Sequence, residues 1–256
     1  MTSPAVLATA PGPWSALSAV YAGQLSRARA ARGPLLFVAT LQSVGILLLL
    51  RGVVDESSNA TARQVVAGST VLVVAYIALN LLAQRFGMLR GTRALDHYAA
   101  LPVSPASVVL GTAASYATFT VPGAVVTAVV GGLLYDLPLG HLWVLALVLP
   151  LAGASLAGLG ALLGLLAPRP EIATTFGQLG MSAVLFLGII PADRMPGAMQ
   201  VLRALVPSTY ATDALAESLR ADPDLGVVLV DLGVCAGAAV VTLVLASLAF
   251  RRAVRR

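Results

Sequence analysis

Long apolar runs dominate the pattern along this chain, and short polar segments separate them. A helix needs roughly 20 apolar residues to cross a bilayer, and six runs approach or exceed that length. They cover residues 34–50, 64–84, 106–134, 142–167, 172–190 and 226–250. Apolar and polar residues do not alternate in them as they do in the strands of a membrane β-barrel. The pattern therefore predicts an all-α integral membrane protein with six transmembrane helices, the third of them kinked at Pro122.

Charged residues divide unequally between the polar segments. With the N-terminus placed in the cytoplasm, the inside segments hold eleven arginines and two acids, whereas the outside segments hold five arginines and eight acids. Cytoplasmic loops of membrane proteins carry such an excess of basic residues, so we expect both termini to be cytoplasmic. Residues 1–13 carry neither a basic charge nor an apolar core, which argues against a signal peptide and predicts a disordered lead.

The composition excludes several classes of protein. Hydrophobic residues make up 58% of the 256 residues and charged residues only 11%, against roughly 25% charged residues in a soluble domain. The mean hydropathy of +0.91 leaves too little polar surface for a soluble enzyme. Cys235 is the only cysteine, which excludes a disulfide-stapled secreted domain. All sixteen basic residues are arginine, so the chain has no lysine for a P-loop or a Schiff base. The net charge of +5 is explained by membrane topology and does not require a nucleic-acid partner.

Residues 14–33 show the periodicity of an amphipathic helix. Their apolar residues recur at steps of three and four and so share one helical face: Trp14, Leu17, Tyr21, Leu25 and Ala28. Three arginines lie near the end of this segment, and Gly33-Pro34 then favours a bend into the membrane. The pattern predicts an interfacial helix on the inner leaflet. The alternative is an ordinary positively charged flank of the first span.

The longest inside segment, residues 85–105, combines basic, acidic and aromatic side chains. Arg90, Arg93, Asp96 and His97 offer polar contacts to a soluble partner, and Pro105 suits the first turn of the next helix. Alternatively, the arginines act only as determinants of topology.

The outside segment before the last span, residues 191–225, shows helical periodicity on both sides of Pro207. Met195, Met199 and Leu202 recur at helical steps before the proline, and a second helical stretch follows over residues 209–220. Its acidic residues, including Asp213, are expected on a water-facing side. This segment predicts two short amphipathic helices that lie in or dip into the outer leaflet, with an ordinary extracellular loop as the alternative.

Two motifs support a family resemblance. They are ALPVSPASVVLG at residues 100–111 and MPGAMQVLRALVPSTYATDALAESLR at residues 195–220. Together with the order of elements, they resemble the type-2 membrane subunits of ABC exporters, and among these the daunorubicin-resistance-like permeases. In that family a proline, Met-Pro, leucine and Thr-Tyr pattern precedes the last span. The positions that match it are Pro191, Met195, Pro196, Leu202, Leu205, Pro207, Thr209, Tyr210, Asp213, Ala214 and Leu215. The chain departs from the family at residues 216–220, where the family has an immediate arginine.

The resemblance implies one half of an exporter in a bacterial plasma membrane, with residues 1–256 as a single permease domain. Two six-span subunits, identical or related, would form the translocation path for drug or antibiotic efflux. A separate P-loop subunit would bind ATP and Mg²⁺, and no cofactor or metal is expected in this chain. The implied ATPase-coupling surface comprises Arg90, Arg93, Asp96, His97, Tyr98 and Leu101. Because apolar spans dominate, we expect an amphipathic substrate such as a drug, antibiotic, lipid or glycolipid.

Polar residues inside the apolar runs are the candidates for lining that path, since polar groups are costly in lipid. We select Gln42, Asn80, Gln178 and Asp231, the last being the one carboxylate within a run. Alternatively, the amides bond neighbouring helices, and Asp231 lies at the level of the lipid headgroups. The pairs Gly160/Gly164 and Gly233/Gly237 predict close helix packing.

Two other functions remain as alternatives. An intramembrane enzyme needs paired acids, a metal cluster or a nucleophile beside a base, but His97 and His141 fall on opposite sides of the membrane and Ser155 has no base nearby. An ion-coupled secondary transporter needs intramembrane charges, and Asp231 is the candidate for that role.

Overall fold

The computed structural model describes residues 12–27, 32–52, 59–92, 94–95, 104–190 and 195–254, and within these ranges every regular element is a helix. Among these described residues, six helices are long and apolar enough to cross a membrane. They are Gly33–Arg51, Asn59–Gly91, Pro105–Leu134, Leu142–Leu166, Pro170–Ile189 and Leu225–Val254. Each contains or closely matches one of the six predicted runs, so the predicted all-α membrane fold is confirmed.

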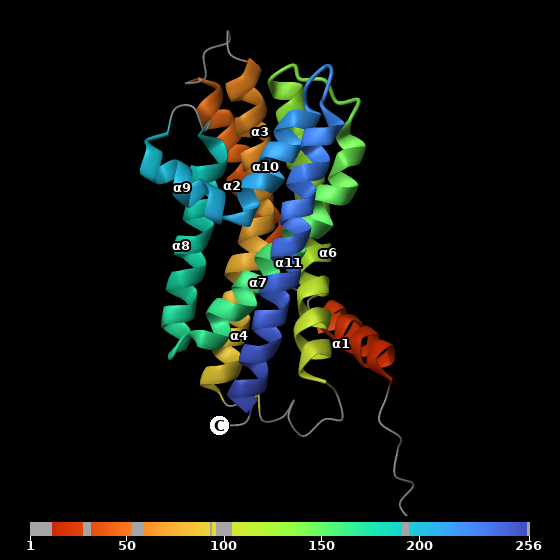
Figure 1. Cartoon of the computed structure of the whole chain (residues 1–256), viewed down its shortest axis with the longest axis vertical. Helices are drawn as coiled ribbons and strands as arrows, with labels where there is room; N and C mark the ends of the chain where they lie inside the picture. Colours follow the sequence, from red (N-terminus) through yellow and green to blue (C-terminus); the bar gives the residue numbers. More distant parts are fainter. Residues whose placement is uncertain are drawn as a thin grey trace, which may run out of the picture.

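The six spans form an elongated bundle with two distinct ends (Figure 1). At one end, here called the base, α4 (Leu82–Gly91), α7 (Leu145–Leu166) and α11 (Leu225–Val254) end, and α6 (Pro105–Leu134) and α8 (Pro170–Ile189) begin. At the other end, here called the top, α2 (Arg32–Arg51) ends and the short helices α9 (Gly197–Leu205) and α10 (Pro207–Ser218) lie.

The second span is the central helix of the bundle. It consists of α3 (Asn59–Val74), the π-helical turn η1 (Ala75–Leu81) and α4, and 89% of its most apolar window is buried. It packs against α6, α7, α8 and α10. The sequence-based boundary at residue 85 is wrong, because the helix continues to Gly91 and carries Arg85 and Arg90. Buried Phe86 and Leu89 extend the apolar contact surface past residue 85 and so keep the chain helical.

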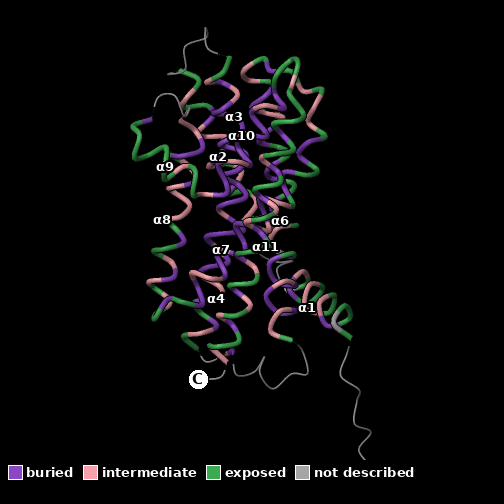
Figure 2. Tube along the Cα trace, viewed as in Figure 1, coloured by how far each residue is buried: buried purple, intermediate pink, exposed green. Residues whose placement is uncertain are grey.

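The peripheral spans begin where the local sequence favours a helix start. Ser104 caps α6, its hydroxyl accepting a hydrogen bond from the Ser107 N–H at 3.0 Å, and Pro105 occupies the first turn as predicted. The α6 helix continues through Pro122. The 3-10 turn η2 (Leu142–Val144) leads into α7. Most residues of α2, α8 and α11 are exposed or partly exposed along the sides of the bundle, as expected for helices that contact lipid or another membrane subunit (Figure 2).

The N-terminal helix α1 (Pro13–Arg27) lies beside the base and packs against α6 (Figure 1). Gly111 of α6 lets α1 approach, since a Cβ there would lie 3.0 Å from the Leu17 carbonyl oxygen. The Tyr21 hydroxyl is hydrogen-bonded to that of Thr118 at 3.2 Å. Trp14 is 81% exposed, which suits a helix that also contacts the membrane interface. The predicted helix is therefore present, while Ala28 and Arg29 lie outside the described residues and Arg32 is the first residue of α2.

The two short helices before the last span differ from each other in burial. In α9 no residue is buried, whereas α10 is buried along most of its length between α3, α7, α8 and α11 (Figure 2). Both short helices are therefore present, and α10 packs into the bundle whereas α9 lies on its surface. Small residues such as Ala211 and Ala214 permit this, because they let the short helix fit between four longer ones.

Helices pack closely at one of the two predicted glycine pairs, Gly160/Gly164. A Cβ on Gly160 would collide with the Leu79 carbonyl oxygen, and one on Gly164 with the Ala83 carbonyl oxygen, so α7 lies directly against the central helix. Gly233 and Gly237 of α11 are exposed, and a Cβ at either position would meet no atom within 4 Å apart from the adjoining backbone of its own helix. The prediction of close packing is thus confirmed for the first pair and wrong within this chain for the second.

Candidate functional site

Asn80 is the most buried of the four candidate path residues, with 4% of its surface exposed. It lies in η1, and single π-turns within long helices occur frequently at functional sites. Its Oδ1 accepts a hydrogen bond from Gln84 Nε2 at 3.1 Å. A Cβ on Gly177 of α8 would lie only 2.8 Å from the same oxygen. Asn80 is therefore a buried polar group between the central helix and α8.

The other three candidates lie in different surroundings. Gln42 is half-buried on α2, and Gln178 is exposed on α8, next in sequence to the glycine that faces Asn80. Asp231 is half-buried in the first two turns of α11, near the top. Asn80 and Gln178 thus both lie beside Gly177 of α8, whereas Asp231 lies nearer the top of the bundle. The four residues therefore do not form a single site in the described protomer.

A cluster of polar residues near the top was missed by the sequence analysis. Arg203 of α9 forms an ion pair with Asp213 of α10, and Gln64 of α3 donates a hydrogen bond from Nε2 to Asp213 Oδ1 at 3.2 Å. The same Gln64 nitrogen donates to the Gly188 carbonyl of α8 at 2.9 Å, and Arg203 Nε donates to the Leu187 carbonyl at 3.3 Å. These contacts join α3, α8, α9 and α10, and we call Gln64, Arg203 and Asp213 the top cluster.

The turn at Pro207 makes the top cluster possible. The Thr209 hydroxyl, with its one proton, lies 2.7 Å from the Arg203 carbonyl oxygen and 2.6 Å from that of Val206, and the Tyr210 hydroxyl donates to the Ala204 carbonyl at 3.0 Å. These bonds fold α10 back on α9 and bring Asp213 toward Arg203. Asp213 was expected on a water-facing side, and that expectation is wrong. The sequence signal that could have predicted this ion pair was the occurrence of opposite charges, Arg203 and Asp213, on either side of the Pro207 turn.

Asp231 lies within electrostatic range of the top cluster. Its carboxylate experiences repulsion from Asp213 and Glu217 and attraction from Arg203. A cation or a positively charged substrate group near Asp231 would therefore meet a region of mixed charge. Within the ranges that the structure describes, no group of three or more His, Cys, Asp or Glu side chains is placed to hold a metal ion.

At the base, Arg90 connects the central helix to the end of α7. Its Nη1 donates hydrogen bonds to the carbonyls of Leu165 at 2.6 Å and Ala167 at 2.9 Å. Carbonyls at a helix C-terminus lack partners within the helix, and an arginine placed there satisfies them. A Cβ on the neighbouring Gly91 would meet Pro170 Cγ at 2.5 Å, so α8 also contacts this point. The remaining coupling candidates lie outside the described residues: Arg93, Asp96, His97, Tyr98 and Leu101.

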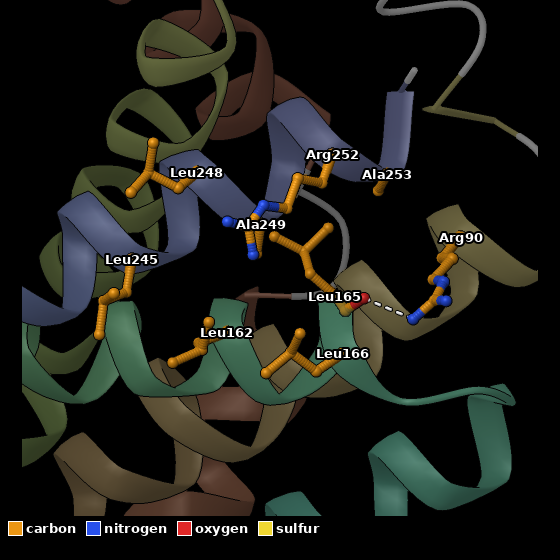
Figure 3. Close-up of a pocket in the computed structure, with 9 residues that line it drawn as sticks. All are labelled: Arg90, Leu162, Leu165, Leu166, Leu245, Leu248, Ala249, Arg252 and Ala253. Atoms are coloured by element: carbon orange, nitrogen blue, oxygen red, sulfur yellow. Dashed lines mark hydrogen bonds between the residues drawn. The ribbon is translucent and has the colours of Figure 1, made fainter. Parts of the chain in front are cut away.

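Two apolar grooves lie on either side of α11 near the base. One, of about 520 Å³, lies between α7 and α11 and includes Arg90 and Arg252 (Figure 3). The other, of about 460 Å³, lies between the start of α6 and α11 and includes Arg251. None of the four candidate path residues lines either groove.

Comparison with known proteins gives a family for most of the chain. Residues 35–248 match the family described as ABC-2 family transporter protein. The match begins in α2 and ends in α11, and so it includes all six membrane spans. No curated protein matches the sequence at a significant level.

Proposed function

Because the chain belongs to the ABC-2 transporter family, we propose that it is the membrane-spanning subunit of an ATP-driven exporter. Members of this family are membrane transport components that work with an ABC ATP-binding subunit and have no nucleotide-binding domain of their own. The observation that carries the proposal is the family match across all six spans. The lack of lysine agrees with it, since a P-loop needs a lysine that this chain does not contain.

In this proposal the base faces the cytoplasm and contacts the ATPase. The excess of arginine in the segments at this end supports the orientation. Residues 93–103 follow directly on the point where Arg90 and Gly91 contact the ends of α7 and α8. A movement of that segment, driven by the ATPase, would therefore act on three spans at once. The residues that we assign to this coupling are Arg90, Arg93, Asp96, His97, Tyr98 and Leu101.

The substrate that we propose is amphipathic, such as a drug, an antibiotic, a lipid or a glycolipid. Charged residues are rare inside the spans: apart from Asp231, the charged residues of the spans lie near the ends of the helices. A strongly charged solute would therefore find few partners along the path. A second permease subunit would complete the path, and α2 and α8, of which only a small part is buried, provide surface for it. The path residues that we propose are Gln42, Asn80, Gln178 and Asp231. We do not adopt ion coupling through Asp231, because the family works with an ATP-binding subunit.

The first test is co-purification from the native host. The full chain, tagged at its C-terminus, is extracted in mild detergent, and the proteins that accompany it are identified by mass spectrometry. We expect a P-loop ATPase in stoichiometric amount, and its loss when Arg90, Arg93 and Asp96 are replaced together by alanine. A control with the same change of charge at the top replaces the exposed residues Arg51, Arg220 and Asp222.

The outcomes separate the function from the coupling surface. Repeated recovery of the chain without any ATPase would contradict the exporter proposal. Recovery of the ATPase with the base variant as well as with the control would leave the exporter proposal standing but would reject the assigned coupling surface. The substrate proposal has its own test in reconstituted vesicles, where transport of a charged hydrophilic solute but of no amphipathic compound would reject it.

A further inference from the structure

The groove between α7 and α11 is apolar along its length and basic at the base. Its walls are the last turn of α7, with Leu162, Leu165 and Leu166, and the last turns of α11, from Leu245 to Ala253. Of the described residues that line it, only Arg90 from α4 and Arg252 from α11 are charged, and both belong to the turns nearest the base (Figure 3). The groove therefore has the polarity of a site for a molecule with an apolar tail and an anionic head.

The apolar part of the groove exposes large side chains. Leu166 is 62% exposed, and Leu245 and Leu248 are 45% and 44% exposed. These leucines lie on two membrane spans, near the ends of both spans at the base. An acyl chain placed between the two helices would contact leucines from both.

The two arginines have complementary roles at the basic end. Two hydrogen bonds hold the Arg90 side chain in place, and Nη1 donates both of them to carbonyls at the end of α7. A guanidinium has five N–H donors, so its Nη2 and Nε donors remain for an anion. Arg252 is exposed at the surface of α11, and Figure 3 shows its guanidinium extending back over the groove toward Ala249.

The charge of the groove identifies the class of occupant. Among the described residues no carboxylate lines it, so within that lining nothing compensates the two positive charges. Guanidinium groups bind phosphate oxygens with charge-assisted and often bidentate hydrogen bonds, and basic pockets between transmembrane helices on the cytoplasmic side bind anionic lipid headgroups. A neutral or zwitterionic lipid would fill the apolar part but would leave the positive charge without a net counter-charge.

We propose that the groove formed by α7, α11 and Arg90 is a binding site for one anionic phospholipid of the inner leaflet. The phosphate binds in the part of the groove that Arg90 and Arg252 line, and an acyl chain lies along Leu162, Leu245 and Leu248. The site does not depend on which compound the exporter moves. It depends on the proposed orientation only in that the base then faces the inner leaflet.

The test compares lipids on the purified full chain in detergent. Delipidated protein is titrated with dioleoyl phosphatidylglycerol or dioleoyl phosphatidylcholine, and bound lipid is measured by native mass spectrometry and by the shift of the thermal unfolding midpoint. We expect the wild type to prefer phosphatidylglycerol by roughly tenfold, and Arg252→Gln to remove most of that preference. Arg169→Gln, which removes an equal charge from the exposed α7–α8 turn, is expected to retain the preference for phosphatidylglycerol.

Each other outcome would overturn the proposal. Equal binding of the two lipids by the wild type would show that charge is not recognised. An equal loss in Arg169→Gln and Arg252→Gln would indicate general surface charge and not this groove. Complete competition by glycerol 3-phosphate at matched concentration would indicate a soluble anion. Unfolding midpoints of the lipid-free variants, equal to that of the wild type, establish that Arg252→Gln has not changed the fold.

Discussion

Arg203 and Asp213 form an ion pair across the Pro207 turn, and this pair fixes a surface helix to a buried one. Their side chains are 14% and 31% exposed, so the pair is partly removed from water. Gln64 of the central helix bonds to the same carboxylate oxygen. The position of α9 therefore depends on its contact with the Asp213 carboxylate of α10.

We expect Asp213→Ala to destabilise the protein. The change leaves Arg203 without its counter-charge and removes the acceptor for Gln64. Breaking a fully buried ion pair costs about 3–5 kcal/mol, and the partial exposure here reduces that to about 1–3 kcal/mol. The midpoint of unfolding in detergent measures the effect. Arg220→Ala, which breaks the exposed pair with Glu217, is the control and should change the midpoint little. A double-mutant cycle with Arg203→Ala that gave no coupling would contradict the assigned pair.

Gly160→Ala and Gly233→Ala are expected to have opposite consequences. A Cβ at position 160 collides with the Leu79 backbone carbonyl, which cannot rotate away, so the two helices must separate at a cost of about 1–3 kcal/mol. At position 233 the space is open, and alanine stabilises the helix by up to about 1 kcal/mol. Unfolding midpoints and the yield of monodisperse protein measure both effects. Equal loss of stability in the two variants would contradict the close contact of α7 with the central helix.

Arg90→Ala is expected to weaken the junction between the central helix and α7. Two carbonyls at the end of α7 lose their donor, and a hydrogen bond to a charged group contributes about 1.5–3 kcal/mol. The loss of stability should be smaller than the sum of two such hydrogen bonds, because water at the lipid headgroups can replace the arginine donor in part. With the ATPase present, we also expect less stimulation of ATP hydrolysis by substrate. Arg51→Ala, at the exposed end of α2, is the control. An unchanged unfolding midpoint together with normal stimulation would reject a role for this contact.

The orientation can be tested with single cysteines. Cys235 is buried and is first replaced by alanine. Gly140→Cys, in the exposed turn after α6, should then react with a membrane-impermeant maleimide in intact cells. Arg169→Cys, in the turn between α7 and α8, should react only after the cells are opened. Labelling of Arg169→Cys and not of Gly140→Cys in intact cells would mean that the topology is inverted.

Tyr135 connects the end of α6 to α2, and its contribution should depend on pH in a defined range. Its hydroxyl donates a hydrogen bond to the Leu47 carbonyl at 2.9 Å, and burial raises the pKa of the Tyr135 phenol, with Arg51 opposing the shift. Since the folded state holds the proton more tightly than the unfolded state, the contribution is constant below about pH 10 and is lost above it. We expect Tyr135→Phe to lower stability by about 1 kcal/mol at neutral pH. A difference between wild type and Tyr135→Phe that changed between pH 6 and 8 would contradict this assignment.

The sequence by itself determined the number and the approximate limits of the spans. A run of about 20 apolar residues satisfies its backbone in lipid only as a helix, so the six runs leave no other regular structure. Local signals were also sufficient at Ser104-Pro105, where α6 begins, and at Pro207, where α10 begins. The same is true of the family, because its motifs occur in contiguous segments that include residues 195–220.

Only the tertiary structure decided which face of each helix meets another helix. In a soluble protein the buried face of a helix is marked by its hydrophobicity, but lipid is as apolar as a protein interior, and the spans are apolar on all sides. Gly160 and Gly233 lie in similar small-residue patterns, yet one contacts the central helix and the other faces open space. Asp213 was likewise assigned to water, because its partners Arg203 and Gln64 approach it only after α10 has folded into the bundle. Contacts of this kind depend on the arrangement of several helices in space, which the periodicity of any one helix does not contain.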